Sequence, residues 1–299
     1  MTRYIGGIDA GGTTFKCGLA QVGDDMDVKW VARRRVTTSE PLETVDSCAN
    51  FFRSTLSDLG ANTKDMTGLG LASFGPLNLD SESDDFGSLL GTPKPGWSGF
   101  RIRQAFVDAL GVPVNIDTDV NAALLAEISG GAAEGANNVA YLTVGTGIGA
   151  GLASNGHIIG RPRHPEFGHI PVARAKGDDN FAGSCSFHAT CLEGMASVTA
   201  LKQRFGDPVE WDAEHPGWDI AADYLAQACR TLHLTTCAEK IVLGGGLMTS
   251  PFILPRIRRR FVEQMAGYLG IANQDAESMI VTPRFGDDAG LRGAVLLFC

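Results

Sequence analysis

Two stretches of the chain repeat one plan, and this repeat constrains the fold more than any other feature. IGGIDAGGTTFKCGLA at 5–20 and VAYLTVGTGIGAGLAS at 139–154 each consist of an apolar run, a glycine–threonine turn and a second apolar run. Such a pattern is typical of two strands joined by a tight turn. Because helical and strand-like segments follow each copy, the repeat predicts a duplicated α/β fold: two similar domains with a cleft between them.

The remaining periodicity supports the α/β class. Apolar spacing predicts helices at 41–60, 102–110, 119–129, 218–238 and 253–269, and further strands at 68–74, 112–117 and 240–247. We expect an N-terminal domain over 1–117, completed by a C-terminal helix at about 287–299, and a C-terminal domain over 118–286.

Composition excludes several classes of function. The net charge is −9 with no compensating basic stripe, which argues against a nucleic-acid partner bound through phosphates. No run of about 18 apolar residues and no secretory signal pattern is found, so we expect no membrane partner. Seven cysteines, an odd number, argue against a disulfide scaffold and indicate a cytoplasmic protein. Glycine is in excess, at 38 of 299 residues.

Three glycine-rich turns follow apolar strands and are candidate phosphate or nucleotide sites. Backbone without Cβ atoms can approach a phosphate closely, and its N–H groups favour anions. The candidates are Asp9, Gly11, Gly12, Thr13, Thr14 and Lys16 in the first turn, Gly145, Thr146 and Gly147 in the second, and Gly244, Gly245 and Gly246 in the third. We expect Asp9 to act through hydrated Mg²⁺. None of the turns matches a P-loop or a dinucleotide fingerprint.

The run Asp117-Thr118-Asp119-Val120-Asn121 lies between a predicted strand and a predicted helix. Asp and Thr are favoured helix N-caps, and one residue here is expected to fill that role. Two aspartates and an asparagine exceed what a cap needs. A carboxylate at the carboxyl end of a strand is also where an α/β sheet places a general base.

A Cys/His cluster indicates a metal site. Cys185, His188 and Cys191 form C-x2-H-x2-C, and His169 and His164 precede it. These three ligands and one further histidine suit tetrahedral Zn²⁺, and four filled positions would make the metal structural. We take His169 as the fourth ligand, with His164 as the alternative.

Together these segments resemble the ROK family of sugar kinases, in its bacterial fructokinase branch. The resemblance is carried by DAGGTTFK at 9–16, SFGP at 73–76, TPKPGW at 92–97, TDVNAA at 118–123, TVGTGIGAG at 143–151, HPEFGHI at 164–170, the cysteine segment 185–193 and IVLGGG at 241–246. It implies an actin-like (ribonuclease H-like) two-domain fold, Mg·ATP as phosphate donor, a sugar hydroxyl as acceptor and a homodimer.

The resemblance also implies residue roles. Asp119 matches the catalytic base, and the three glycine turns match the phosphate, Mg²⁺ and adenosine positions. The residues that match sugar-contacting positions or loops are Gly75, Pro76, Thr92, Glu166, His169 and Glu193. His169 also matches a zinc ligand, so that zinc shapes the sugar pocket. Thr118 replaces the asparagine of many relatives, which changes one sugar contact, and His188 replaces a cysteine.

The leading hypothesis is therefore an ATP-dependent kinase that phosphorylates fructose at its 6-hydroxyl. Glucose, mannose and N-acetylated hexosamines remain alternative substrates, because only the shape of the pocket distinguishes them. A sugar-sensing member of the family without catalysis is the alternative from another class. Intact Asp9, Asp119 and glycine turns favour the enzyme.

Overall fold

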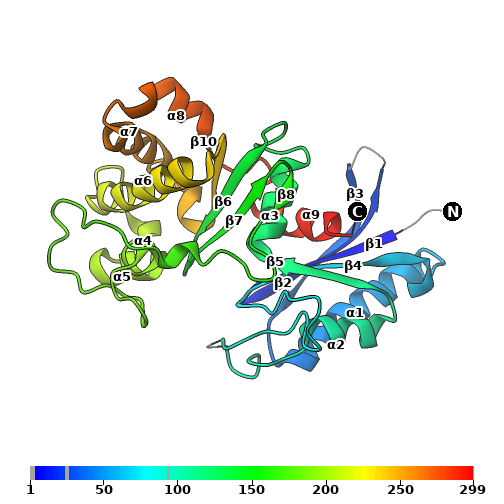
Figure 1. The fold of residues 1–299 in the computed structure, drawn as a ribbon. Helices are drawn as coiled ribbons and strands as arrows, with labels where there is room; N and C mark the ends of the chain where they lie inside the picture. Colours follow the sequence, from blue (N-terminus) through cyan, green and yellow to red (C-terminus); the bar gives the residue numbers. More distant parts are fainter. Residues whose placement is uncertain (1–3, 24–26, 93, 299) are drawn as a thin grey trace. The chain divides into compact units, whose positions relative to one another are not determined.

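The computed structural model describes residues 4–23, 27–92 and 94–298. It divides into two compact units (Figure 1). Unit 1 comprises Met1–Ser129, Gly160–His164 and Asp287–Cys299, and unit 2 comprises Gly130–Ile159 and Pro165–Gly286.

Unit 1 is built on a five-stranded sheet with the order β3-β2-β1-β4-β5. The strands are β1 Tyr4–Ala10, β2 Thr14–Val22, β3 Val28–Thr37, β4 Met66–Ser73 and β5 Val114–Thr118. The first three are antiparallel neighbours, whereas β4 and β5 run parallel to β1. The helices of this unit are α1 Pro41–Asp58, α2 Ile102–Leu110, α3 Asp119–Ile128 and α9 Ala289–Leu296, with short turns η1 Thr63–Asp65 and η6 Gly286–Asp288. The first residue of η6, Gly286, is assigned to unit 2.

Side chains along the strands of unit 1 point alternately to the two faces of the sheet, and each face packs in its own apolar layer. Phe15 and Leu19 belong to the core that packs under α1 and α2, and Ala20 belongs to the cluster with Val295 of α9. Figure 1 shows α1 and α2 on one side of this sheet and α3 and α9 on the other. Both faces are therefore covered, as expected for the parallel part of a sheet.

Unit 2 repeats the arrangement of unit 1. Its sheet has the order β10-β9-β6-β7-β8, with β6 antiparallel to β7 and parallel to β9. Its strands are β6 Asn138–Val144, β7 Ile148–Ser154, β8 His157–Ile158, β9 Lys240–Gly244 and β10 Ile280–Val281. Its helices are α4 Leu192–Ala196, α5 Val198–Phe205, α6 Gly217–Thr236, α7 Ile253–Met265 and α8 Asn273–Met279, with short turns η2 Phe167–His169, η3 Pro208–Glu210, η4 Gly246–Thr249 and η5 Tyr268–Gly270. The strand order confirms the duplication predicted from the two glycine-turn stretches.

The structure differs from the sequence expectations at several places. It assigns α3 to unit 1, because this helix packs on α9, whereas the predicted boundary put residues from 118 onward in the second domain. The helix predicted over 253–269 ends at Met265, because Ala266 and Gly267 take left-handed backbone conformations. Strand β3 was not predicted.

The described residues contain no helix that is both long and apolar enough to cross a membrane.

Candidate functional site

In unit 1, the first glycine turn places a carboxylate and an amine side by side. The Gly11 N–H donates to the Thr14 carbonyl (3.1 Å), which closes the turn between β1 and β2. Asp9 and Lys16 face each other across these strands, and Lys16 Nζ lies 3.1 Å from Asp9 Oδ2. Burial raises the pKa of Asp9, and the Lys16 cation opposes that shift.

Helix α9 begins directly beside Asp9. A Cβ atom on Gly290, in the first turn of α9, would lie 2.8 Å from Asp9 Oδ2. The partial positive charge of a helix N-terminus favours a carboxylate at this place. Lys16 Nζ also contacts Asp287, at 2.8 Å from Oδ1 and 2.6 Å from the carbonyl oxygen. Lys16 is thus shared by two acidic residues, and a phosphate contact from it stays a prediction.

The two aspartates at the end of β5 have different surroundings. Asp117 is fully buried, and its Oδ1 accepts hydrogen bonds from the Thr118 N–H and from Asn121 Nδ2 (both 2.7 Å). Its Oδ2 accepts from Arg161. Asp119 is partly exposed, and its Oδ1 accepts from the Val120 N–H at 2.8 Å. The structure therefore leaves Asp119 as the carboxylate able to meet a substrate.

Asp119 has the proton affinity of a base that works near neutral pH. Desolvation by the surrounding protein, with the nearby Asp9 charge second, raises the pKa of Asp119 from 3.8 to about 7. A general base is most effective when its pKa lies near the working pH. Thr118 caps α3, since its Oγ1 accepts from the Asn121 N–H at 3.1 Å, and its predicted sugar contact is not tested.

In unit 2, the second glycine turn is bound to Glu193. Glu193 Oε2 accepts a hydrogen bond from the Ile148 N–H at 2.9 Å. A Cβ on Gly147 would lie 2.5 Å from the same oxygen, so that only glycine fits there without a shift. A Cβ on Gly145 would meet nothing within 4 Å, and Thr146 is exposed. Gly145 and Thr146 thus remain open to a ligand.

The third glycine run divides in the same way. A Cβ on Gly244 would lie 2.2 Å from the Tyr141 hydroxyl, so this glycine serves packing. Gly245 has a φ of +90° and approaches the Val144 backbone. A Cβ on Gly246 would meet no atom within 4 Å, and the same holds for Gly12 in the first turn. Each glycine run thus combines positions required by the fold with one that is open to solvent.

The four predicted metal ligands lie together in unit 2. One ligand atom from each of His169, Cys185, His188 and Cys191 lies within 4.8 Å of the others. His169 Nδ1 is 3.7 Å from Cys185 Sγ and 3.6 Å from Cys191 Sγ. Zn–S and Zn–N bonds in a tetrahedron separate sulfur and nitrogen by about 3.6 Å, so this donor set fits zinc.

Backbone N–H groups support the sulfur ligands. The His188 N–H donates to Cys185 Sγ, and the Gly194 N–H donates to Cys191 Sγ (both 3.5 Å). Such donors stabilise thiolates and orient ligands. The alternative ligand His164 lies in unit 1, where its Nε2 accepts from the Leu77 N–H at 3.4 Å.

The other predicted sugar-site residues are dispersed over the two units. Gly75, Pro76 and Thr92 are in unit 1, and Glu166, His169 and Glu193 are in unit 2. Two residues near the site were missed. Lys94 donates to the Gly12 carbonyl, and Arg161 pairs with Asp117. Lys94 could have been found, because it lies within the TPKPGW segment that carries the family resemblance. Nothing in the sequence linked Arg161 to Asp117.

Comparisons with known proteins identify the class. The ROK family model matches residues 5–299, and the chain belongs to this family. A fructokinase of Zymomonas mobilis is 40% identical, covering 99% of this chain and 96% of that protein. A fructokinase of Pediococcus pentosaceus is 34% identical, covering 98% and 96%.

Solved structures agree with this assignment. A ROK hexokinase from Thermus thermophilus is similar, with a TM-score of 0.79 and 26% identity over 98% of this chain and 97% of that one. A Streptomyces griseus ROK glucokinase solved with glucose and AMPPNP has a TM-score of 0.74 and 22% identity, covering 98% of both chains. The predicted actin-like α/β fold and the predicted class, a sugar kinase, are confirmed.

Proposed function

We propose that this protein transfers the γ-phosphate of Mg·ATP to the 6-hydroxyl of fructose, with Asp119 as the general base. The observation that carries the proposal is Asp119 itself, a partly exposed carboxylate at the start of α3 with a pKa of about 7. The identity of 34–40% to fructokinases over nearly the whole chain favours fructose over other hexoses.

In this mechanism, Asp119 accepts the proton of the sugar hydroxyl as the hydroxyl oxygen attacks the phosphorus. Phosphoryl transfer needs mainly positioning and charge stabilisation, and the base removes the proton that would otherwise oppose attack. Asp117 cannot take this role, because hydrogen bonds from the backbone, Asn121 and Arg161 occupy its oxygens.

The glycine turns supply donors for the phosphates. In unit 1, Gly12 and Thr13 are exposed, and in unit 2 so is Thr146. Asp9, beside the start of α9, suits hydrated Mg²⁺, which would neutralise phosphate charge when bound. In the third glycine run, we place the adenosine of ATP next to Gly246.

The metal cluster is proposed to bind structural Zn²⁺ through His169, Cys185, His188 and Cys191. Cys191 caps α4, and this helix carries Glu193. Four protein ligands leave no position for an activated water, so the ion orders the loop that bears the sugar-binding side chains. Glu166 and Glu193, on either side of these ligands in sequence, are the proposed sugar contacts.

The decisive experiment measures ADP release with fructose, mannose, glucose, N-acetylmannosamine and N-acetylglucosamine. We expect the highest kcat/KM for fructose, and phosphorus NMR of the product to show a 6-phosphate. A higher kcat/KM for another sugar would replace fructose as the substrate. Sugar binding in calorimetry without ADP release would favour a sensor.

We also propose a cytoplasmic homodimer. The cysteines in the described part of the chain are all free, which fits a reducing compartment. Sedimentation equilibrium tests the dimer, which is a property implied by the family.

A further inference from the structure

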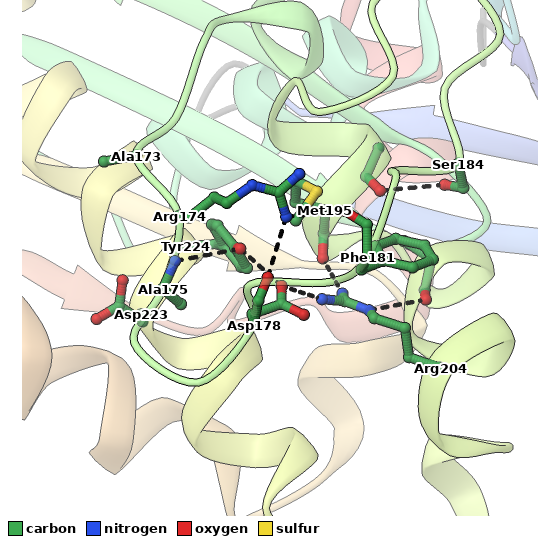
Figure 2. Close-up of polar contacts among 12 residues, drawn as sticks. Ala173, Arg174, Ala175, Asp178, Phe181, Ser184, Met195, Arg204, Asp223 and Tyr224 are labelled. Carbon is green, nitrogen blue, oxygen red and sulfur yellow. Dashed lines mark hydrogen bonds and ion pairs between the residues drawn. The ribbon is translucent and has the colours of Figure 1, made fainter.

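A buried polar network lies in unit 2, apart from the proposed ligand and substrate residues (Figure 2). The side chains of Arg204 and Asp178 are only 6% and 5% exposed, and they form an ion pair. The Tyr224 hydroxyl donates to the same carboxylate oxygen of Asp178 at 2.7 Å. Burial, followed by Asp178, raises the pKa of Tyr224 to about 12, so its hydroxyl stays a donor.

Arg204 joins three parts of the unit. Besides Asp178, its guanidinium donates to the carbonyls of Met195 in α4 and of Ala200 in its own helix α5. It also lies 4.4 Å from the ring centroid of Phe181. Figure 2 shows the guanidinium between Asp178 and α4, with Phe181 beside it. The side chain of Arg204 thus fixes the end of α4 relative to the loop that carries Asp178.

That loop, residues 173–184, is held along its length. The Ala173 N–H and carbonyl bond to the Gln227 amide (2.8 and 2.9 Å), and the Ala175 N–H donates to the Tyr224 hydroxyl (3.2 Å). The Arg174 side chain donates to the carbonyls of Asp178 and Phe181 at 3.0 and 2.8 Å. Helix α6, which carries Gln227 and Tyr224, therefore anchors a loop that has no regular secondary structure.

The held loop leads directly into the metal ligands. The Ser184 N–H donates to the Gly194 carbonyl at 3.0 Å, one residue before Cys185. At the other end of the ligand segment, Cys191 begins α4, and Arg204 holds α4 at Met195. Both ends of the segment 185–191 are thus tied to the network.

Stability alone does not explain this network. Buried ion pairs are costly to desolvate, and well-packed apolar residues often replace them without loss of stability. What an apolar replacement lacks is the set of directed bonds that hold one loop conformation. Groups behind metal ligands commonly change metal affinity by about 10- to 100-fold.

We propose that Arg204, with Asp178 and Tyr224, is a positioning residue for the metal ligands and, through α4, for Glu193. The proposal rests on the zinc site of the proposed function. Loss of the Arg204 contacts would let α4 and the loop 173–184 move apart, and the two ends of the segment 185–191 would move with them. Metal affinity and sugar affinity would then fall together, while the proton chemistry at Asp119 in unit 1 remains unchanged.

The test compares Arg204→Met with Lys202→Met. Lys202 lies on the same helix and forms an exposed ion pair with Asp207 (2.6 Å), so it controls for loss of a cation from α5. Zinc content is measured first in the wild-type protein, and Zn²⁺ dissociation constants are then measured by chelator competition. We expect Arg204→Met to weaken zinc binding about tenfold or more and to raise the sugar KM more than it lowers kcat. Lys202→Met should match the wild type.

The outcomes are separable. Wild-type protein without zinc affinity overturns the metal site itself, whereas tight wild-type binding that Arg204→Met leaves unchanged overturns only the role of Arg204. If Arg204→Met fails to fold, Tyr224→Phe removes a single hydroxyl from Asp178 and Ala175 and keeps the ring. We expect weaker zinc binding in Tyr224→Phe, and unchanged affinity in that variant also contradicts the proposal.

Discussion

Arg161 forms an ion pair with the fully buried carboxylate of Asp117, two positions before Asp119. Together with the bonds from Thr118 and Asn121, this pair uses both oxygens of Asp117. In the described part of the chain, Asp119 has no ion pair. The residue pattern alone left open which residue of this run is the base and which the cap, and only the resemblance to the family assigned the base to Asp119. In the structure, Thr118 caps α3, and both carboxylate oxygens of Asp117 accept hydrogen bonds from the protein. Asp119 therefore remains available to a substrate.

Replacing Asp119 should abolish most of the activity. We expect Asp119→Asn to lower kcat by about 10²–10⁴-fold, because an amide cannot accept the hydroxyl proton, with little change in sugar affinity. Steady-state kinetics and sugar calorimetry measure the two effects. Asp117→Asn is the matched control: it should lose stability, because an amide replaces the buried carboxylate that accepts bonds from Arg161, the Thr118 N–H and Asn121. Near-normal turnover in Asp119→Asn would remove Asp119 from its role.

The activity should depend on pH through the same carboxylate. The base must be ionised, and burial raises the pKa of Asp119 to about 7. We therefore expect kcat/KM to rise as the pH increases through about 7 and to level off above it. The profile is measured between about pH 5.5 and 9, with melting curves to exclude unfolding. A profile that stays flat down to the lowest pH would contradict this assignment.

The raised pKa also predicts a gain in stability when the charge is removed. Since the folded state holds the Asp119 proton more tightly than the unfolded chain, the ionised group costs stability above its ordinary pKa of 3.8, and the full cost is reached above about 7. Asp119→Asn should therefore be more stable than the wild type at alkaline pH, by up to about 4 kcal/mol for a pKa raised from 3.8 to about 7, with no gain in acid. Urea unfolding at several pH values checks this, and an equal gain at every pH would point to packing instead.

The second glycine turn separates sugar effects from nucleotide effects. A Cβ on Gly147 would press on Glu193, whereas one on Gly145 would enter open space. We expect Gly147→Ala to raise the sugar KM about tenfold, equivalent to about 1.4 kcal/mol, with a smaller effect on the KM of ATP. Gly145→Ala should do the reverse, because the methyl group occupies space proposed for phosphate. Equal changes in both variants would mean that the turn merely loses its shape.

The duplicated fold was predictable because glycine turns between apolar strands are local patterns, which can be recognised without knowledge of the tertiary contacts. Strand β3 was missed because its arginines obscure the alternation, and at Arg33 and Arg35 they pair with Asp288 and Asp287, which are remote in sequence. The placement of α3 in unit 1 likewise depends on contacts with α9, at the other end of the chain.

In the candidate site, too, features that depend on local sequence spacing were predictable, and contacts between residues distant in sequence were not. The cluster of four candidate metal ligands could be predicted because three of them lie within seven residues and follow a known spacing. Three bonds to buried aspartates join residues 26 to 46 positions apart: those of Arg161 to Asp117, of Arg204 to Asp178 and of Tyr224 to Asp178. No pattern in a single sequence encodes such pairings.

Lys16 should set the charge state of Asp9 and hence the Mg²⁺ requirement. Lys16 Nζ lies 3.1 Å from Asp9 and 2.8 Å from Asp287. The Lys16 cation lowers the pKa of Asp9, and the Asp287 charge raises it. In Lys16→Met, Asp9 should hold its proton to higher pH, so that more Mg²⁺ is needed for half-maximal activity, with a larger effect in mild acid than in base.

Asp287→Asn gives the opposing control. Without the Asp287 carboxylate, Lys16 serves Asp9 alone, and Asp9 loses a neighbouring negative charge. The Mg²⁺ requirement should therefore fall in mild acid, the reverse of the Lys16→Met result. Mg²⁺ titrations at two pH values, with ATP held saturating, measure both variants. A shift in Lys16→Met that is equal at both pH values would show that Lys16 acts on bound phosphate instead of on Asp9, because loss of a phosphate contact does not depend on the charge of Asp9.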